Sequence, residues 1–453
     1  MKFIIPEKTT QVCEILKNAG YRAYLVGGCV RDMLMENQPQ DYDIATDALP
    51  EEIEKTFRDA GAYILNIAGA HEHGVVFVFY QREKFEIATF RADKEYADLR
   101  HCETQFGVSL HEDLARRDFT VNAMAYDPFT EELVDVYEGQ KDLQQKIIRA
   151  VGDPQRRFNE DGLRILRAFR FSAQLGFQIE ENTLQAAAEC CENLKQISHE
   201  RKEAEITKIL LYQPDILIQM HELGILKILL PELDICFACE QINPYHYEDV
   251  GRHTIKVIEN IEPTKSLRWI ALLHDLGKPA MKTTDEKGID HFRGHPAESA
   301  RIAEEILKRY KFSRSFTEYA IVQVFHHDRP LPTKKAIRKF IGKFGLDALY
   351  DHLKVRRADI LAHSENFVPG LLVELEKEKI LIEELLLEDP DNDYRFEDLA
   401  IKGQDIMDLG VPQGKEIGIL LKEAYEFTLE DPSKNNREDL LEYIKETMSV
   451  EME

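Results

Sequence analysis

Leu25-Val26-Gly27-Gly28-Cys29-Val30-Arg31-Asp32 is followed nine residues later by Asp41-Tyr42-Asp43-Ile44. Residues i and i+2 of an extended segment point to the same face, about 6–7 Å apart along the strand. The two aspartates can therefore share a pair of Mg²⁺ ions. Two such ions, about 3.5–4 Å apart, can activate an attacking hydroxyl and neutralise charge on a leaving phosphate. The glycines let backbone N–H groups approach and cradle a triphosphate. Together the segments outline a site for nucleotidyl transfer.

Each segment alone has an ordinary interpretation. A Gly-Gly pair is most often a turn, and an Asp-x-Asp just beyond Pro39 is most often a solvated loop. In this order and at this spacing the segments resemble the N-terminal signature of class II tRNA nucleotidyltransferases and bacterial poly(A) polymerases, members of the polymerase-β-like nucleotidyltransferases. The resemblance implies that Asp41 and Asp43 are catalytic Mg²⁺ ligands. It also implies that Gly28 and Arg31 bind the nucleotide.

The superfamily pattern calls for a third carboxylate on a neighbouring strand. Phe85-Glu86-Ile87-Ala88 places one between apolar neighbours, as is typical of a strand that turns an acid toward a site. We therefore expect Glu86 to be the third catalytic carboxylate. An exposed glutamate on a half-buried strand remains the alternative interpretation.

The run from Arg116 to Ala123, Arg-Arg-Asp-Phe-Thr-Val-Asn-Ala, resembles the next family motif. A guanidinium can hold phosphate oxygens through two parallel hydrogen bonds, so we expect Arg117 to contact the triphosphate or the base. We expect Asp118 to order the arginines rather than to bind metal.

The strongest resemblance to the family lies in the run from Glu160 to Phe171. Arg164, Arg167 and Arg170 recur every third residue and predict a basic stripe on a helix, with an apolar stripe packed inward. By resemblance, Asp161 and Arg164 present an acceptor and donors to the Watson–Crick edge of cytosine or adenine. Arg167 and Arg170 then hold the triphosphate.

The segment from Phe90 to Asp113 is charged, has no clear period and has no glycine before Gly107. By analogy it is the loop that switches the template from C to A. This favours addition of the complete CCA, or of the final A alone. A surface loop without a special role is the alternative.

A second group of motifs follows residue 240. Adjacent His-Asp on an apolar helix, with an earlier histidine and a late aspartate, resembles the HD metal-dependent phosphohydrolases. The resemblance implies a mixed nitrogen and oxygen site suited to Mn²⁺, Ni²⁺, Fe or Mg²⁺. Its implied ligands are His253, His274, Asp275 and Asp359. His295 and His327 are candidates for a second metal or for the phosphate.

The composition predicts a cytoplasmic enzyme. Seven cysteines at irregular positions argue for a reduced compartment, and no apolar run reaches the length of a membrane span. The net charge of −25 is unusual for an RNA enzyme, but phosphate binding needs only a local basic surface. The partners implied by the resemblance are tRNA, CTP and ATP, with no membrane.

The predicted fold class is α+β: a polymerase-β-like mixed sheet with helices, then an all-α neck, an HD-type helical domain and a helical tail. We place these parts at residues 1–145, 146–240, 241–365 and 366–453. The implied activity is CCA addition to tRNA with release of pyrophosphate. The alternatives are an enzyme that adds only A, and an HD phosphohydrolase that acts on RNA ends.

Overall fold

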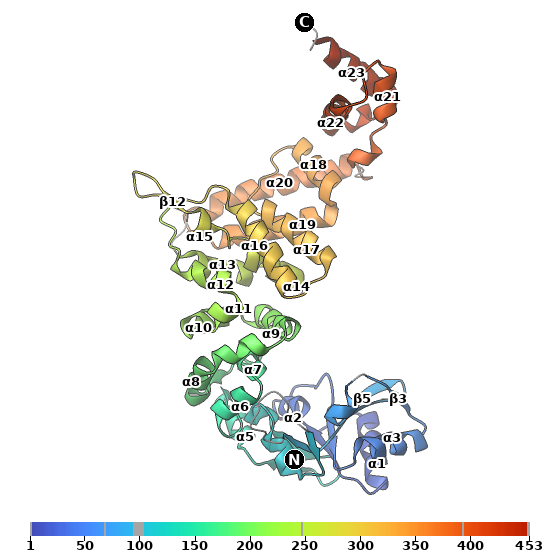
Figure 1. Ribbon diagram of the computed structural model, residues 1–453, viewed down its shortest axis with the longest axis vertical. Coiled ribbons are helices and arrows are strands. Elements are labelled where there is room, and N and C mark those ends of the chain that lie inside the picture. Colours follow the sequence, from blue (N-terminus) through green and yellow to red (C-terminus); the bar gives the residue numbers. More distant parts are fainter. Residues whose placement is uncertain (1, 68, 94–103, 246–247, 392–393, 451–453) are drawn as a thin grey trace. The chain divides into compact units, whose positions relative to one another are not determined.

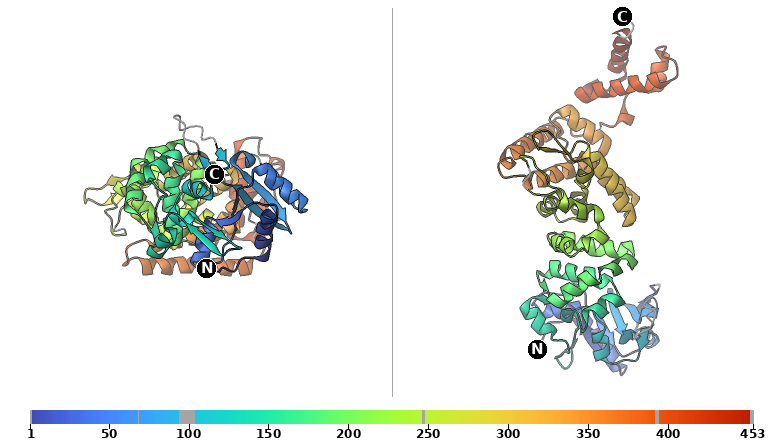
Figure 2. Two further views of the ribbon diagram at one scale, coloured as in Figure 1. Left: turned by 90° about the horizontal axis from the view of Figure 1, so that it is seen from below. Right: turned by 60° about the vertical axis from the view of Figure 1, so that its left-hand side comes forward.

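The computed structural model describes residues 2–67, 69–93, 104–245, 248–391 and 394–450. The chain divides into two compact units, Met1–Leu229 and Leu230–Glu453, and each is described by itself. The long strands all belong to the first unit, and the second unit is helical apart from a short hairpin, as the colours of Figures 1 and 2 show. This confirms the predicted fold class.

The described residues of the first unit contain a seven-stranded mixed sheet. Its strands β2 and β5 are parallel neighbours, and the other adjacent pairs are antiparallel. In spatial order the strands are β3 (Tyr63–Leu65), β4 (Val75–Tyr80), β5 (Glu83–Thr89), β2 (Ile44–Thr46), β1 (Ala23–Val26), β8 (Met124–Asp127) and β9 (Glu132–Asp135).

Helices cover both faces of this sheet because apolar residues alternate along its central strands. In β1, Leu25 packs into the core formed with α1 (Glu7–Asn18), α2 (Gly28–Leu34) and α3 (Pro50–Asp59). The next residue, Val26, packs on the opposite face with α4 (Leu110–Ala115). Burial of both faces holds the strand ends, where the candidate site lies, in fixed positions.

The sheet and the following helices share a core. Phe119, Ile148, Phe171 and Phe177 form one buried cluster, which therefore crosses the expected boundary near residue 145. The remaining strands and α-helices of the first unit are β6 (Arg91–Asp93), β7 (Thr104–Phe106), α5 (Gly139–Gln145), β10 (Ile147–Ile148), α6 (Pro154–Glu160), α7 (Leu163–Leu175), β11 (Gln178–Ile179), α8 (Glu181–Glu189), α9 (His199–Tyr212), α10 (Ile216–Glu222) and α11 (Leu226–Leu229). Positions 94–103 of the expected C-to-A loop lie outside the described residues.

Two of the apolar clusters among the described residues lie in the second unit. One cluster joins Ile337 and Leu349 to Leu375 and Ile382, so it crosses the expected domain boundary at residue 365. The other cluster lies in the C-terminal helices. The strands and α-helices of the second unit are α12 (Pro231–Asp234), α13 (Val250–Asn260), α14 (Lys265–Leu273), α15 (Lys278–Met281), β12 (Thr283–Thr284), β13 (Asp290–His291), α16 (His295–Arg309), α17 (Arg314–His326), α18 (Lys334–Phe344), α19 (Leu346–Leu361), α20 (Val368–Glu388), α21 (Gly403–Asp408), α22 (Lys415–Glu430) and α23 (Arg437–Val450). Among the described helices, none has the length and apolar character required to cross a membrane.

Candidate functional site

The register of two parallel strands brings the acidic residues of the first unit together. Ile44 of β2 pairs with Ile87 of β5, so the preceding residues, Asp43 and Glu86, are neighbours at the same end of the sheet. Asp41 lies two residues earlier in the extended segment that leads into β2. All three carboxylates line one cavity of about 520 Å³.

The carboxylates disturb one another electrostatically. Loss of hydration raises the pKa of Asp43, an effect that Arg117 opposes and Asp41 strengthens. Loss of hydration, followed by the charge of Asp43, also raises the pKa of Glu86. Negative charge gathered in this way favours a bound cation, and carboxylate oxygens are the donors that hard divalent cations prefer. The residues present therefore fit a divalent metal.

A tight turn places an arginine beside these carboxylates. Gly27 joins β1 to α2 with φ 75°, a conformation that side-chain-bearing residues rarely adopt. A Cβ at this position would lie 3.0 Å from Nη1 of Arg117 and 3.8 Å from Oδ2 of Asp43. Gly28 is the first residue of α2. The structure thus brings together the glycine turn, one metal-binding candidate and the predicted phosphate ligand.

Two of the predicted nucleotide ligands are enclosed by the protein. Arg31 donates to Oδ1 of Asn122 at 2.8 Å and to Oδ1 of Asp32 at 2.8 Å. Arg170 donates to Oε2 of Glu205 at 2.8 Å. Only 5% and 6% of these two arginines are exposed, so little of either side chain is accessible to a nucleotide. Their contact with nucleotide stays a prediction.

Each of the two base-selecting candidates has at least one partner close in the sequence and one that is distant. Asp161 lies in the break between α6 and α7, where its carboxylate accepts from N of Leu163 at 3.0 Å and from Arg201 at 2.8 Å. Arg164 donates to Oε2 of Glu160 at 2.5 Å and to the carbonyl oxygen of Arg116 at 2.9 Å. These contacts fix both side chains at the start of α7.

The buried Asp113 was missed in the sequence. Its carboxylate accepts from Arg116 at 2.9 and 3.0 Å, from Arg117 at 3.2 Å and from N of Arg91 at 3.3 Å. Asp118, which we expected to order Arg116 and Arg117, instead pairs with Arg167 at 2.7 Å. The i,i+3 and i,i+4 spacing from Asp113 to the two arginines is the local signal that could have revealed it.

Histidines and aspartates from several helices meet in the second unit. His253 of α13 lies with Nε2 3.0 Å from Oδ1 of Asp359 on α19. His274, which ends α14, lies with Nε2 3.1 Å from Oδ2 of Asp275. The structure therefore brings all four predicted HD ligands together, and the two further candidates, His327 at the end of α17 and His295 at the start of α16, lie in the same cluster.

Three of the histidines in this cluster turn a ring nitrogen without a proton toward it when they are neutral. Nδ1 of His274, His295 and His327 lies 2.7, 2.9 and 2.7 Å from a backbone carbonyl oxygen. Each Nδ1 must carry the proton to make that hydrogen bond, which leaves the Nε2 lone pair for a ligand. Histidine ligands in metal sites are commonly oriented in this way.

Asp275 is shared by two sets of histidines. Its Oδ2 approaches His253 and His274, and its Oδ1 lies 3.2 Å from Nε2 of His295 and 3.5 Å from Nε2 of His327. Burial opposes ionisation, but His274, when it is protonated, and the charge of Lys278 hold the pKa of Asp275 well below its usual range.

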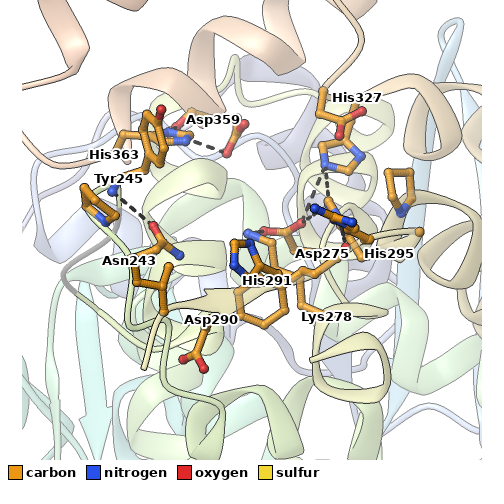
Figure 3. Close-up of a pocket in the computed structure, with 17 residues that line it drawn as sticks. Asn243, Tyr245, Asp275, Lys278, Asp290, His291, His295, His327, Asp359 and His363 are labelled. Atoms are coloured by element: carbon orange, nitrogen blue, oxygen red, sulfur yellow. Dashed lines mark hydrogen bonds and ion pairs between the residues drawn. The ribbon is translucent and has the colours of Figure 1, made fainter. Parts of the chain in front are cut away.

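The cluster lines a cavity of about 450 Å³. In this cavity both His295 and His327 contact Asp275 (Figure 3). Nε2 of His274 and both Asp275 oxygens are buried without a hydrogen bond of normal geometry to any described residue. Such atoms fit a divalent metal.

Three segments of the chain match known protein domains. Residues 23–149 match the poly A polymerase head domain, and residues 176–236 match the "Probable RNA and SrmB- binding site of polymerase A". Residues 246–388 match the HD domain. Head and HD domains of these kinds depend on divalent metals, in agreement with the two candidate metal sites.

The relatives are CCA-adding enzymes. The protein of Lactobacillus helveticus is 45% identical over 203 residues, which are 45% of this chain and 49% of that one. The protein of Bacillus subtilis is 44% identical over 204 residues, 45% of this chain and 50% of that one. The chain spans about half the length of the curated relatives it matches.

Solved structures extend the similarity along the chain. The CCA-adding enzyme of Bacillus stearothermophilus in complex with CTP has a TM-score of 0.73 and 25% identity, with 99% of each chain covered. The Thermotoga maritima CCA-adding enzyme complexed with tRNA has the same fold, with a TM-score of 0.55 at 20% identity over 98% of this chain and 96% of that chain. By these matches the chain combines a domain similar to the poly A polymerase head, a segment similar to the RNA-binding site of polymerase A, and an HD domain. Its fold is that of the solved CCA-adding enzymes.

Proposed function

We propose that the chain adds the 3′-terminal CCA to tRNA, using CTP and ATP and releasing pyrophosphate. The observation that carries this proposal is the convergence of Asp41, Asp43 and Glu86 on one cavity beside the Gly27 turn and Arg117. The similarity to a CTP-bound CCA-adding enzyme over 99% of the chain supports it. The free thiols of the described cysteines suit the reduced environment of the cytoplasm.

In the proposed reaction the 3′-hydroxyl oxygen of the tRNA bonds to the α-phosphorus of the incoming nucleotide. The α–β phosphoanhydride bond breaks, and the hydroxyl proton passes to solvent. Asp41, Asp43 and Glu86 would hold Mg²⁺, which when bound neutralises triphosphate charge and activates the hydroxyl. No protein nucleophile is needed.

Base selection falls to Asp161 and Arg164. The carboxylate accepts from the exocyclic amine that cytosine and adenine share, and the guanidinium donates to the neighbouring ring nitrogen or carbonyl. A base with the wrong pattern leaves buried polar groups unpaired, at a cost of about 1–3 kcal/mol per group. The triphosphate ligands in this proposal are Gly28, Arg31, Arg117, Arg167 and Arg170.

Incorporation of labelled CTP and ATP with Mg²⁺ tests this function. The substrates are three matched tRNAs that end at the discriminator base, at C or at CC. We expect CCA on the shortest tRNA, and a loss of about 100-fold or more in Asp43→Asn. Asp59→Asn, an exposed aspartate at the end of α3, serves as the matched control. Addition of A to the CC-ended tRNA alone would identify an A-adding enzyme, and normal activity of Asp43→Asn would refute the metal assignment.

A second proposed function is hydrolysis of phosphate esters at RNA ends by the HD site. It is supported by the histidine Nε2 atoms that lie near Asp275 and by the cavity that Asp275, His295 and His327 line. Release of inorganic phosphate from a 3′-phosphorylated RNA tests it. We expect Asp275→Asn to abolish release but to keep nucleotide incorporation, and Asp43→Asn to do the reverse. Equal loss of both activities in Asp275→Asn would contradict two separate sites.

A further inference from the structure

One aromatic ring lies at the mouth of the HD cavity. Tyr245 lines the cavity, and 48% of its surface is exposed. Its ring packs against Phe367, with 4.6 Å between ring centroids. Its carbonyl oxygen accepts from N of Ser364 at 2.8 Å, and its own N donates to Oδ1 of Asn243 at 3.0 Å. The ring is therefore positioned before any ligand arrives.

An exposed aromatic ring held in this way is suited to stacking. Burial of its second face on a planar ligand removes apolar surface from water, and little conformational freedom is lost because the backbone is already fixed. Every nucleobase offers a planar face, so base–aromatic stacking is a common basis for binding single-stranded RNA. Tyr245 thus offers a surface for a base next to the metal-ligand cluster (Figure 3).

The same cavity presents a cation that is free to bind phosphate. Arg293 lies between β13 and α16 and is exposed, and it makes no hydrogen bond or ion pair with any described residue. Lys278, by contrast, contacts Oδ2 of Asp275 at 2.6 Å and Oε1 of Gln241 at 2.9 Å. A guanidinium can hold two phosphate oxygens at once. Arg293 is therefore the available phosphate ligand.

We propose that the HD cavity takes a 3′-terminal ribonucleotide phosphate, with its base on Tyr245 and its phosphate between Arg293 and the Asp275 cluster. This rests on the proposed phosphohydrolase function. The cavity volume of about 450 Å³ lies within the usual range for small-ligand sites. A base-free phosphate ester would use Arg293 but could not use Tyr245.

The reaction is a hydrolysis. A water oxygen bonds to phosphorus, the ester bond from phosphorus to the 3′ oxygen breaks, and a water proton passes to that oxygen. The products are inorganic phosphate and an RNA with a free 3′-hydroxyl. A free 3′-hydroxyl is the group that nucleotide addition by the head domain requires, so the HD reaction would supply a substrate for the first site.

The test compares adenosine 3′-monophosphate with glycerol 2-phosphate as substrates of the full-length, metal-loaded protein. For Tyr245→Ala we expect the ratio of their kcat/KM values to fall about tenfold, as one base–aromatic stack is lost. Tyr245→Phe should restore the ratio because the ring remains. Tyr350→Ala, which removes an exposed tyrosine from α19 outside this cavity, is the control. Arg293→Gln should raise KM at least fivefold for both substrates.

Calorimetric binding of adenosine 3′-monophosphate to the full chain in EDTA gives a readout that is independent of hydrolysis. We expect about tenfold weaker binding in Tyr245→Ala. A ratio and an affinity unchanged by Tyr245→Ala would overturn the stacking assignment, and an unchanged KM in Arg293→Gln would overturn the phosphate assignment. If the wild type hydrolyses neither substrate, the proposed phosphohydrolase function is wrong. The calorimetric effect of Tyr245→Ala on the binding of adenosine 3′-monophosphate then decides whether the cavity binds the nucleotide through Tyr245.

Discussion

His295 and His327 face each other with their Nε2 atoms 3.3 Å apart, although neither nitrogen carries a proton in the neutral ring. Each Nδ1 already donates to a backbone carbonyl oxygen, of Phe292 and Val324 respectively. Two lone pairs at this distance repel unless a proton or a metal lies between them. Oδ1 of Asp275 approaches both rings, which completes a set of donors for a second cation.

Replacement of one of these rings should therefore remove one metal ion. We expect His295→Ala to lower the number of Mn²⁺ ions bound per chain by one, as measured by equilibrium dialysis. The first set of donors, around His253 and Asp359, remains intact in this variant. His111→Ala, an exposed histidine of the first unit, should bind as many ions as the wild type. An equal count in His295→Ala and wild type would show that His295 is no ligand.

The glycine turn of the head domain offers a test with a matched control. Gly27→Ala adds backbone strain at φ 75° and a Cβ 3.0 Å from Nη1 of Arg117, so we expect nucleotide incorporation to fall about tenfold or more. Gly20→Ala adds similar strain at φ 94° with nothing within 4 Å, and it should keep incorporation normal at a small cost in stability. If both variants lost activity equally, strain rather than the displaced arginine would be the cause.

Local patterns were sufficient to single out the candidate residues that lie close together in sequence, although their roles stay predictions. The glycine turn before α2 and the Asp41 and Asp43 pair before β2 could be found because each motif is short and each neighbouring strand is strongly apolar. The four residues predicted as HD ligands were singled out by a resemblance in the order of their motifs, and the structure places them together, while their binding of metal stays a prediction. The prediction of a mixed sheet followed by helices was confirmed because it, too, was based on local apolar patterns.

Partners distant in sequence could not be found in this way. Arg201 binds Asp161 from 40 residues away, and Glu205 binds Arg170 from 35 residues away. Such pairs depend on how α7 packs against α9, which no local period reveals. The expected domain boundaries near residues 145 and 365 fall inside apolar cores whose members come from both sides of each boundary. Turns and charged segments in a sequence mark where helices and strands end, but they do not show which residues share a core.

Asp113 should influence which nucleotide is added. Its carboxylate joins Arg116 and Arg117 to the backbone of Arg91, the first residue of β6, which lies near the start of the segment expected to switch the template. We expect Asp113→Asn to reduce A addition to a CC-ended tRNA at least tenfold more than C addition to the shortest tRNA. Glu112→Gln, the exposed neighbour on α4, is the control. An equal fall in both additions would indicate only a structural role.

A buried histidine in the second unit should make stability depend on pH. His352 of α19 donates from Nε2 to the carbonyl oxygen of Arg329 at 3.0 Å and packs against Phe340. Burial, followed by the charge of Arg356, lowers its pKa to about 3. The unfolded chain, with a histidine pKa of about 6.5, thus binds the proton that the folded chain excludes. His352 therefore contributes full stability above pH 6.5, and this contribution is lost as the pH falls toward 3.

Linkage gives the size of this effect. Between pH 7 and pH 5 the exclusion of one proton should lower the free energy of unfolding by about 2 kcal/mol. His352→Gln keeps a side-chain donor but does not titrate, so its unfolding free energy should fall by about 2 kcal/mol less than that of the wild type over this range. Urea unfolding of both proteins at pH 5, 6 and 7 measures the difference, in which the other titrating groups cancel. Parallel pH profiles for the two proteins would show that His352 can be protonated in the folded state.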